Sequence, residues 1–361
     1  MAHITESRER CRPHSRSVGR VFIVDWHFIL IALIKIVAVL FFALLPMVAY
    51  SVFAERKLSA WIQDRVGPNR TGFWGLGQPI ADVLKLFLKE DFTPVGVRKG
   101  YFWIAPAITL IPAFMTVAVI PFGSQIGGEK MVIADLNVGI LYTFGIVSLG
   151  VYGIVLAGYA ANSKYPFLGG IRSSAQMISY EISMGMSVIP VFLIVGSLNL
   201  SQVIQNQVEH GWMILRAPLS FFIFLAAAFA ETNRLPFDLP ESEQELVGGY
   251  HTEYSSMKFA LFFLSEYANM IASSAMMVTL FLGGWTLPGF SATANSIGAG
   301  VLHIGIFLAK LACFMLVIMW VRWMWPRFRY DQLMDLGWRR FIPLALANIL
   351  VTAVVLWLKP A

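Results

Sequence analysis

Carboxylates within or at the edge of long apolar stretches are the residues of this chain that could do chemistry. One falls in each of three such stretches: Glu181, Glu231 and Glu266. A charged side chain at the centre of a bilayer costs at least about 2.5 kcal/mol, so each should face a protein interior, take up a proton, or contact a partner or water. A single buried Glu is often only a hydrogen-bonded structural residue. Three of them, with Lys310 as a candidate cationic partner, favour a proton relay, and we expect them to converge on one hydrated cavity.

A second group of acids lies in the segment AETNRLPFDLPESEQELVGGYHTEY at residues 230–254. We call four of its glutamates the acidic loop: Glu241, Glu243, Glu245 and Glu253. The segment lies between two apolar runs, where carboxylates lose hydration unless water, a cation or a proton compensates them. A solvated surface loop is the alternative interpretation, and the three intramembrane acids favour proton handling.

Composition places the chain in the membrane. Of its 361 residues, 57% are hydrophobic and 13% are charged, which is too little polar surface to solvate a globule of this size. The two cysteines, Cys11 and Cys313, have no His or Cys at ligand spacing, so a metal or haem ligand set is not visible. The net charge of +6 could suggest nucleic acid, but the Lys and Arg residues flank apolar spans, where they orient a membrane protein.

The apolar pattern predicts an all-α, polytopic membrane protein with about eight transmembrane helices, because about 20 apolar residues cross a bilayer. We place these spans at residues 28–53, 101–122, 138–161, 177–196, 212–231, 257–283, 298–322 and 341–358. Residues 28–358 then form a single transmembrane domain, preceded by a basic tail at residues 1–27. Lys and Arg gather in the connections after the odd-numbered spans, so these connections should be cytoplasmic.

The first of these connections contains a predicted amphipathic helix. Its apolar positions recur at helical spacing: Ile80, Val83, Leu84, Phe87 and Leu88. Such a helix is typical of segments that lie in the membrane interface. It is either a simple anchor or the sill of a lateral opening for a lipid-soluble molecule.

Four long runs resemble one protein family. They are ERKLSAWIQDRVGPNRTG, the helix with the pattern AD, KL and KED, YPFLGGIRSSAQMISYEISMG at 165–185, and ETNRLPFDLPESEQELVGGYHTEYSSMKFALFFLSEY at 231–267. These motifs are similar to those of the H subunit of bacterial NADH:quinone oxidoreductase, respiratory complex I, whose family includes mitochondrial NADH dehydrogenase subunit 1. The likeness extends from about residue 28 to residue 358, and the Arg-rich tail departs from it.

The resemblance implies a membrane subunit of a proton-pumping enzyme in the inner membrane of a bacterium. It implies a chain that binds no cofactor and has a quinone as substrate, with NADH, flavin mononucleotide and iron–sulfur clusters in partner subunits. The hydrophilic arm would meet its cytoplasmic loops, small membrane subunits and lipids would lie beside it, and nucleic acid would not bind. Residues matching the quinone chamber are Glu55, Arg56, Asp64 and Arg65. Those matching the proton path are Glu181, Glu231, Glu266 and the acidic loop.

Two other interpretations are open. A membrane subunit of a group 4 hydrogenase, or of a related dehydrogenase, has a similar sequence and a different electron acceptor. A stand-alone secondary ion transporter would instead show an inverted repeat and broken helices in matched halves, which the sequence does not display.

Overall fold

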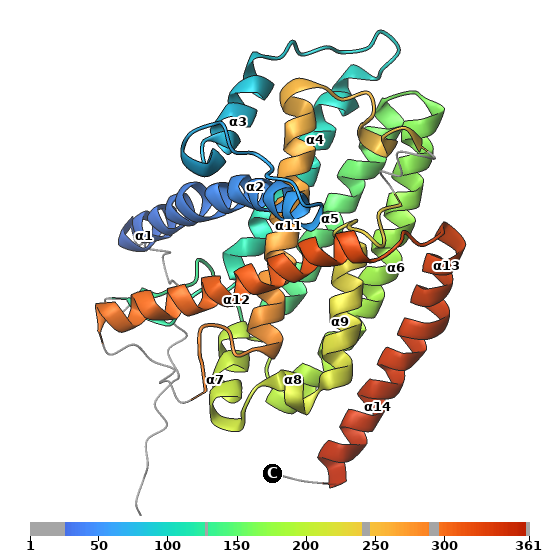
Figure 1. Ribbon diagram of the computed structural model, residues 1–361. Helices are drawn as coiled ribbons and strands as arrows, with labels where there is room; N and C mark the ends of the chain where they lie inside the picture. Colours follow the sequence, from blue (N-terminus) through green and yellow to red (C-terminus); the bar gives the residue numbers. More distant parts are fainter. Residues whose placement is uncertain (1–25, 127–128, 240–245, 289–295, 359–361) are drawn as a thin grey trace, which may run out of the picture.

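The computed structural model describes residues 26–126, 129–239, 246–288 and 296–358, and within these ranges it is almost entirely helical (Figure 1). The strands of the described ranges are β1 (Gln125–Ile126) and β2 (Glu129–Lys130), which pair as one antiparallel hairpin. Helices dominate because backbone in hydrocarbon must satisfy its N–H and C=O groups within its own segment. The prediction of an all-α membrane fold is confirmed.

The first helix is continuous over three pieces: α1 (Trp26–Val37), a π-helical stretch (Ala38–Leu44) and α2 (Leu45–Ile62). The helices of the middle of the chain are α3 (Gln78–Leu88), α4 (Lys99–Thr116), α5 (Gly139–Ala160), α6 (Lys164–Val195), α7 (Leu200–His210), α8 (Met213–Arg216) and α9 (Pro218–Glu231). The last are α11 (Ser256–Phe281), α12 (Ile297–Met324), α13 (Tyr330–Asp335), a π-helical stretch (Leu336–Phe341) and α14 (Ile342–Leu358). Short 3₁₀ turns lie at Phe73–Gly75, Val117–Val119 and Gly249–His251.

Seven helices of the described residues are long and apolar enough to cross a membrane. The predicted fifth span is different, because Pro218 begins a new helix and separates α8 from α9 at a non-helical Ala217. With 14 residues, α9 is an eighth, shorter apolar helix. The first helix continues past residue 53 to Ile62, since Glu, Arg and Lys are good helix formers and extend it beyond its apolar part.

Helices α4, α5, α6 and α9 pack side by side in chain order, and α11 packs against α4. Small residues permit these close contacts, as is usual between membrane helices. A Cβ at Gly153 of α5 would collide with Thr109 of α4. A Cβ at Gly169 of α6 would lie 2.8 Å from the Cα of Gly249. The turn Gly249–His251 therefore packs closely against α6.

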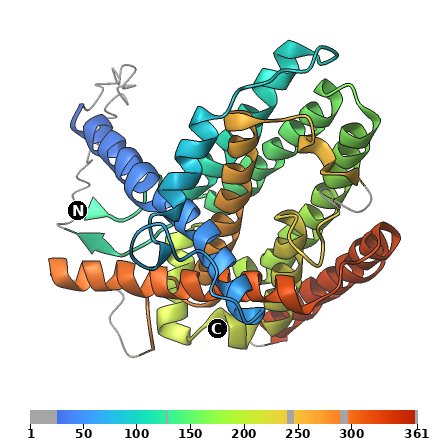
Figure 2. The same ribbon diagram turned by 45° about the horizontal axis from the view of Figure 1, so that its top comes forward.

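Two helices cross this bundle instead of running along it. In Figures 1 and 2, α12 runs at a steep angle to α11, and the α1–α2 helix also lies across the bundle. Helices α2 and α12 contact each other. This crossing brings the end of the first helix and the end of α12 to the same place on α11.

The predicted amphipathic helix is confirmed as α3. Its apolar side chains are not covered by the described chain: Ile80 is 64% exposed, Phe87 67% and Leu88 86%. Its polar side contacts α2 through an ion pair, in which Arg56 Nη1 lies 2.6 Å from Asp82 Oδ2. At its other end, the Ser256 hydroxyl donates to the carbonyl oxygens of Leu86 and Lys89, each at 3.0 Å. The location of α3 in the membrane interface stays a prediction.

Candidate functional site

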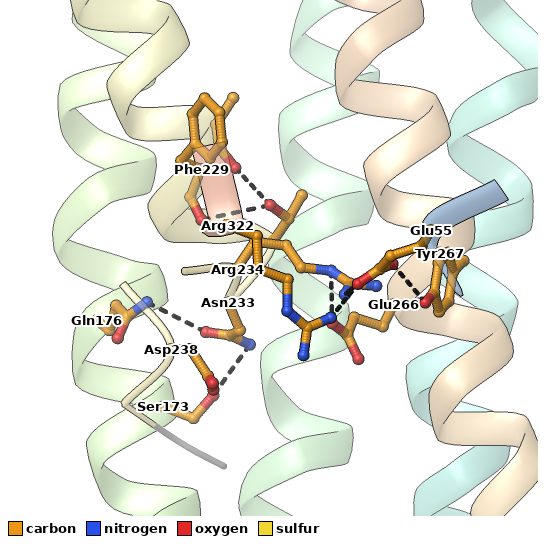
Figure 3. Close-up of polar contacts among 12 residues, drawn as sticks. Glu55, Ser173, Gln176, Phe229, Asn233, Arg234, Asp238, Glu266, Tyr267 and Arg322 are labelled. Atoms are coloured by element: carbon orange, nitrogen blue, oxygen red, sulfur yellow. Dashed lines mark hydrogen bonds and ion pairs between the residues drawn. The ribbon is translucent and has the colours of Figure 1, made fainter. Parts of the chain in front are cut away.

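Glu55 of α2 is the centre of a buried ionic cluster, shown in Figure 3. Its carboxylate accepts from Arg234 Nη1, 3.3 Å from both oxygens, and from the Tyr267 hydroxyl at 2.7 Å. Arg322, near the end of α12, forms a further ion pair with it. Two cations and a hydroxyl therefore surround one carboxylate, which compensates its burial.

Arg234 joins two carboxylates. Its Nε lies 2.9 Å from Glu266 Oε1, and its guanidinium carbon lies 4.4 Å from the centre of the Tyr267 ring. Burial lowers the pKa of Arg234, but the carboxylates of Glu266 and Glu55 raise it more, so the guanidinium stays charged. Arg234 Nη2 has no hydrogen-bond partner among the described residues. The cluster thus contains charged side chains and one buried donor, Arg234 Nη2, that makes no hydrogen bond to the described residues.

The segment after α9 places Arg234 because α6 holds it by hydrogen bonds. Gln176 Nε2 donates to the carbonyl oxygens of Ala230 and Phe237, each at 2.7 Å. Asn233 Nδ2 donates to the Ser173 hydroxyl at 3.4 Å. A buried amide that satisfies two carbonyls fixes the turn between them. The direction of Arg234 is therefore set by α6.

A further ion pair extends the cluster towards α13. Arg327 Nη2 lies 2.9 Å from Asp238 Oδ2. Burial raises the pKa of Asp238, and the nearby guanidinium of Arg327 opposes this only in part. Asp238 Oδ1 has no hydrogen-bond partner in the described part of the chain. Asp238 can therefore change its protonation state more easily than an ordinary surface carboxylate.

Glu231 faces a different place, a small internal cavity of about 40 Å³. The polar residues on the cavity wall, besides Glu231, are Thr116, Thr143, Thr232, Asn269 and Ser273. Glu231 is buried, and its Oε2 lacks a hydrogen-bond partner among the described residues. The cavity is larger than the roughly 15 Å³ that one water needs, but most of its exposed wall is apolar. The charges of Glu231 and Glu181 are close enough to interact, and the side chain of Ser148 in α5 approaches Glu181.

The three acids that are predicted to lie in the membrane thus form two groups. Glu231 and Glu181 are near each other, and Glu231 lines the cavity, whereas Glu266 lies in the ionic cluster with Glu55. The expected cationic partner, Lys310, is used elsewhere. Its Nζ donates to the carbonyl oxygens of Leu282, Gly284 and Thr286, at 2.5–3.0 Å. Lys310 therefore caps the C-terminal end of α11. The cations of the ionic cluster are arginines instead.

The other residues matched to the quinone chamber lie at the surface. Arg56 pairs with Asp82 of α3, while Asp64 and Arg65 are exposed, with Arg65 Nε 2.7 Å from Gln63 Oε1. In the acidic loop, Glu253 is half-buried. The remaining members lie outside the described residues: Glu241, Glu243 and Glu245. Of the four chamber positions, Glu55 alone joins the ionic cluster.

Sequence reasoning missed the partners of these acids. They are Arg234, Asp238, Tyr267, Arg322 and Arg327. A signal was present for some of them: Arg234 and Asp238 lie in the singled-out acidic segment, and Tyr267 follows Glu266 directly. Arg322 gave none, because an Arg at the end of a span usually reads as an orienting charge. In the described residues, no group of three or more His, Cys, Asp or Glu could hold a metal ion.

Comparison with known proteins decides the family. A sequence model of the NADH dehydrogenase family matches residues 34–353. The chain is 49% identical to the NADH-quinone oxidoreductase H subunit of Flavobacterium psychrophilum over 343 residues, 93% of this chain and 99% of that protein. This chain belongs to the family of NADH-quinone oxidoreductase H subunits. Another member, H subunit 1 of Geobacter metallireducens, is 50% identical over 327 residues, covering 90% of this chain and 96% of the relative. In Cytophaga hutchinsonii, H subunit 1 is 48% identical over 322 residues, 88% of this chain and 94% of that protein. The family match covers all the charged residues of the ionic cluster, from Glu55 to Arg327.

Proposed function

We propose that this chain is the membrane subunit of a proton-pumping NADH:quinone oxidoreductase. In this role it forms much of the quinone chamber and the start of the acidic path that couples quinone reduction to proton translocation. The observation that carries the proposal is the buried cluster of Glu55, Arg234 and Glu266. Arg56, the residue after Glu55, pairs with Asp82 of α3, and Asn269, three residues after Glu266, lines the cavity at Glu231. Family membership and the names of the relatives support the same role.

The chemistry requires protons where electrons arrive. Reduction of a quinone to a quinol takes up two electrons and two protons, and in this proposal the electrons come from flavin and iron–sulfur clusters in partner subunits. Negative charge on the quinone is costly in an apolar chamber, so it favours proton uptake from nearby acids. Glu55 and Glu266 share one arginine, so a change of charge at either carboxylate alters its attraction to Arg234. That shift is the proposed link between the quinone and the path.

The surface of the chain suggests how its substrate and partners reach it. Helix α3 presents an uncovered apolar face, which suits the sill of a lateral opening from the bilayer. Arg56, the residue next to Glu55, forms an ion pair with Asp82 of α3. We place the hydrophilic arm at the cytoplasmic loops, small membrane subunits and lipids beside the bundle, and the whole in the inner membrane of a bacterium. Residues 28–358 act as a single membrane domain behind the basic tail.

The two alternatives, a hydrogenase membrane subunit and a stand-alone ion transporter, differ from the proposal in the partner proteins that they require. The relatives described above are named as subunits of NADH-quinone oxidoreductase, which favours a quinone over the acceptor of a group 4 hydrogenase. A stand-alone ion transporter would work without partner subunits. Co-purification in mild detergent separates these cases: flavin and iron–sulfur proteins are expected with the chain, and a hydrogenase large subunit or an isolated chain would contradict the proposal.

The decisive test is at Glu231. Replacement by Gln keeps size and hydrogen bonding but removes the exchangeable proton, whereas Asp keeps the proton. Glu231→Gln should depress quinone reduction and proton pumping together in proteoliposomes, and Glu231→Asp should retain part of both. Glu209→Gln on the exposed end of α7 is the matched control, because that side chain is 71% exposed. Full turnover and full pumping by Glu231→Gln, at normal levels of assembled complex, would remove Glu231 from the mechanism.

A further inference from the structure

A second cavity, of about 210 Å³, lies on the face where three connections meet, away from the ionic cluster. These connections join α4 to α5, α6 to α7 and α11 to α12. The charge pattern of the sequence places all of them on the same side of the membrane, opposite to the acidic loop. The polar residues that line the cavity are Ser124, Gln125, Lys130, Asp135, Asn199, Ser201, Gln202 and Gln205. The proposed function uses none of them.

The cavity offers charge of both signs. Lys130 Nζ lies 2.6 Å from Asp135 Oδ2, and Asn199 Nδ2 donates to Asp135 Oδ1 at 2.9 Å. Burial raises the pKa of Asp135, but the hydrogen bonds from Lys130 and Asn199 lower it more, so the carboxylate is ionised. A ligand that carries both an anion and a cation can pair its anion with Lys130 and its cation with Asp135. A purely anionic ligand would be repelled by the carboxylate of Asp135.

The cavity also adjoins lipid-facing helices. The hairpin that forms one of its walls is bound to the first span, since Lys35 Nζ of α1 lies 3.0 Å from Glu129 Oε2 and donates to the carbonyl oxygen of Lys130 at 3.1 Å. Figure 2 shows the hairpin between α1 and α12. The adjoining outer faces are apolar and uncovered by the described chain, as at Leu30 (58% exposed) on α1 and Ile297 (67% exposed) on α12. In a membrane such apolar faces are covered by acyl chains or by neighbouring membrane helices.

We propose that this cavity binds the headgroup of a zwitterionic phospholipid that carries a phosphate and a primary ammonium group, with its acyl chains along α1 and α12. Lys130 binds the phosphate and Asp135 the ammonium. The amides of Gln125, Gln202 and Gln205 supply further donors and acceptors at the rim. The volume suits a headgroup rather than a whole ligand, because pockets that enclose drug-sized molecules measure roughly 300–1,000 Å³. The site does not depend on the proposed function.

The test measures bound lipid in the purified protein together with the subunits that co-purify with it. After delipidation in detergent, phosphatidylethanolamine is added back and counted by native mass spectrometry. Asp135→Asn keeps the shape and removes the charge, and Gln202→Trp fills the cavity from α7 without changing charge. Each variant should bind this lipid at least about tenfold more weakly. For Asp135→Asn the reason is the lost hydrogen bond to a charged group, which stabilises by about 1.5–3 kcal/mol. For Gln202→Trp the reason is that the indole occupies the cavity. Glu209→Gln, on the same helix but outside the cavity, should bind like wild type.

Three results would overturn the proposal. The first is equal binding of phosphatidylethanolamine by wild type and by Gln202→Trp, the variant that leaves the Lys130 and Asp135 pair intact. The second is a site that does not require the ammonium group, shown by equal affinity for phosphatidylglycerol or by displacement of the lipid by inorganic phosphate alone. The third is protection of this face by a bound polypeptide with no lipid present, which would identify a subunit contact. Quinone reduction should be retained in all variants, so this test can fail without affecting the proposed function.

Discussion

Replacing Arg234 by Gln should destabilise the folded chain strongly, because Arg234 lies between two carboxylates in the interior. Glu266 would then have no cation at ion-pair distance among the described residues, and Glu55 would keep only Arg322. The side chains of Arg234 and Glu266 are 7% and 13% exposed, so the cost typical of a broken buried ion pair applies, about 3–5 kcal/mol. Loss of the contact with the Tyr267 ring adds to it.

The free energy of unfolding can be measured by SDS titration of the purified chain in mixed micelles, followed by tryptophan fluorescence. The double variant Arg234→Gln with Glu266→Gln should be less destabilised than the single variant, because no buried carboxylate is left facing an empty site. The control is Arg329→Gln: that arginine is 78% exposed and pairs with an exposed Asp331, so its loss should cost less than about 1 kcal/mol. Two results would refute this account of the cluster. One is a free energy of unfolding of Arg234→Gln within about 1 kcal/mol of wild type. The other is a double variant whose destabilisation equals the sum of the destabilisations of the two single variants.

Three further predictions concern other parts of the chain. Gly169→Ala should destabilise by about 1–3 kcal/mol, because its Cβ would meet backbone atoms of Gly249, whereas Gly185→Ala has open space and should be neutral; equal effects in the same titration would contradict the close packing. Burial lowers the pKa of His251 from 6.5 to about 4, so the unfolded chain binds a proton that the folded chain does not, and stability falls as pH decreases through this window. Between pH 7 and pH 5 wild type should lose about 2 kcal/mol more than His251→Gln, and parallel pH curves would exclude this role. Replacing all glutamates of the acidic loop by Gln should slow quinone-linked NADH oxidation and spare electron transfer to a water-soluble acceptor, and unchanged quinone activity would favour a solvated loop.

The sequence predicted the spans and α3 well because both depend on local apolar periodicity. It placed Glu181, Glu231 and Glu266 in or at the ends of apolar helices for the same reason. The partners of those acids could not be predicted, since hydropathy gives the length of a helix but not the direction in which it crosses its neighbours. The steep path of α12 brings Arg322 to Glu55, and no local pattern records that path. Lys310 was expected to pair with an acid, but the carbonyls left free at the end of α11 are nearer to it.

The sequence separation within the ionic cluster sets the order in which the chain can be completed during synthesis. Glu55 is 179 residues ahead of Arg234, 212 ahead of Tyr267 and 267 ahead of Arg322. Domains form from the N-terminus as translation proceeds, so this carboxylate is synthesised long before any of these partners exists. A nascent chain stopped before residue 322 carries an incompletely compensated acid in its first helix. Closure of the cluster is therefore a late event, which marks a chain whose first seven apolar helices are all in place.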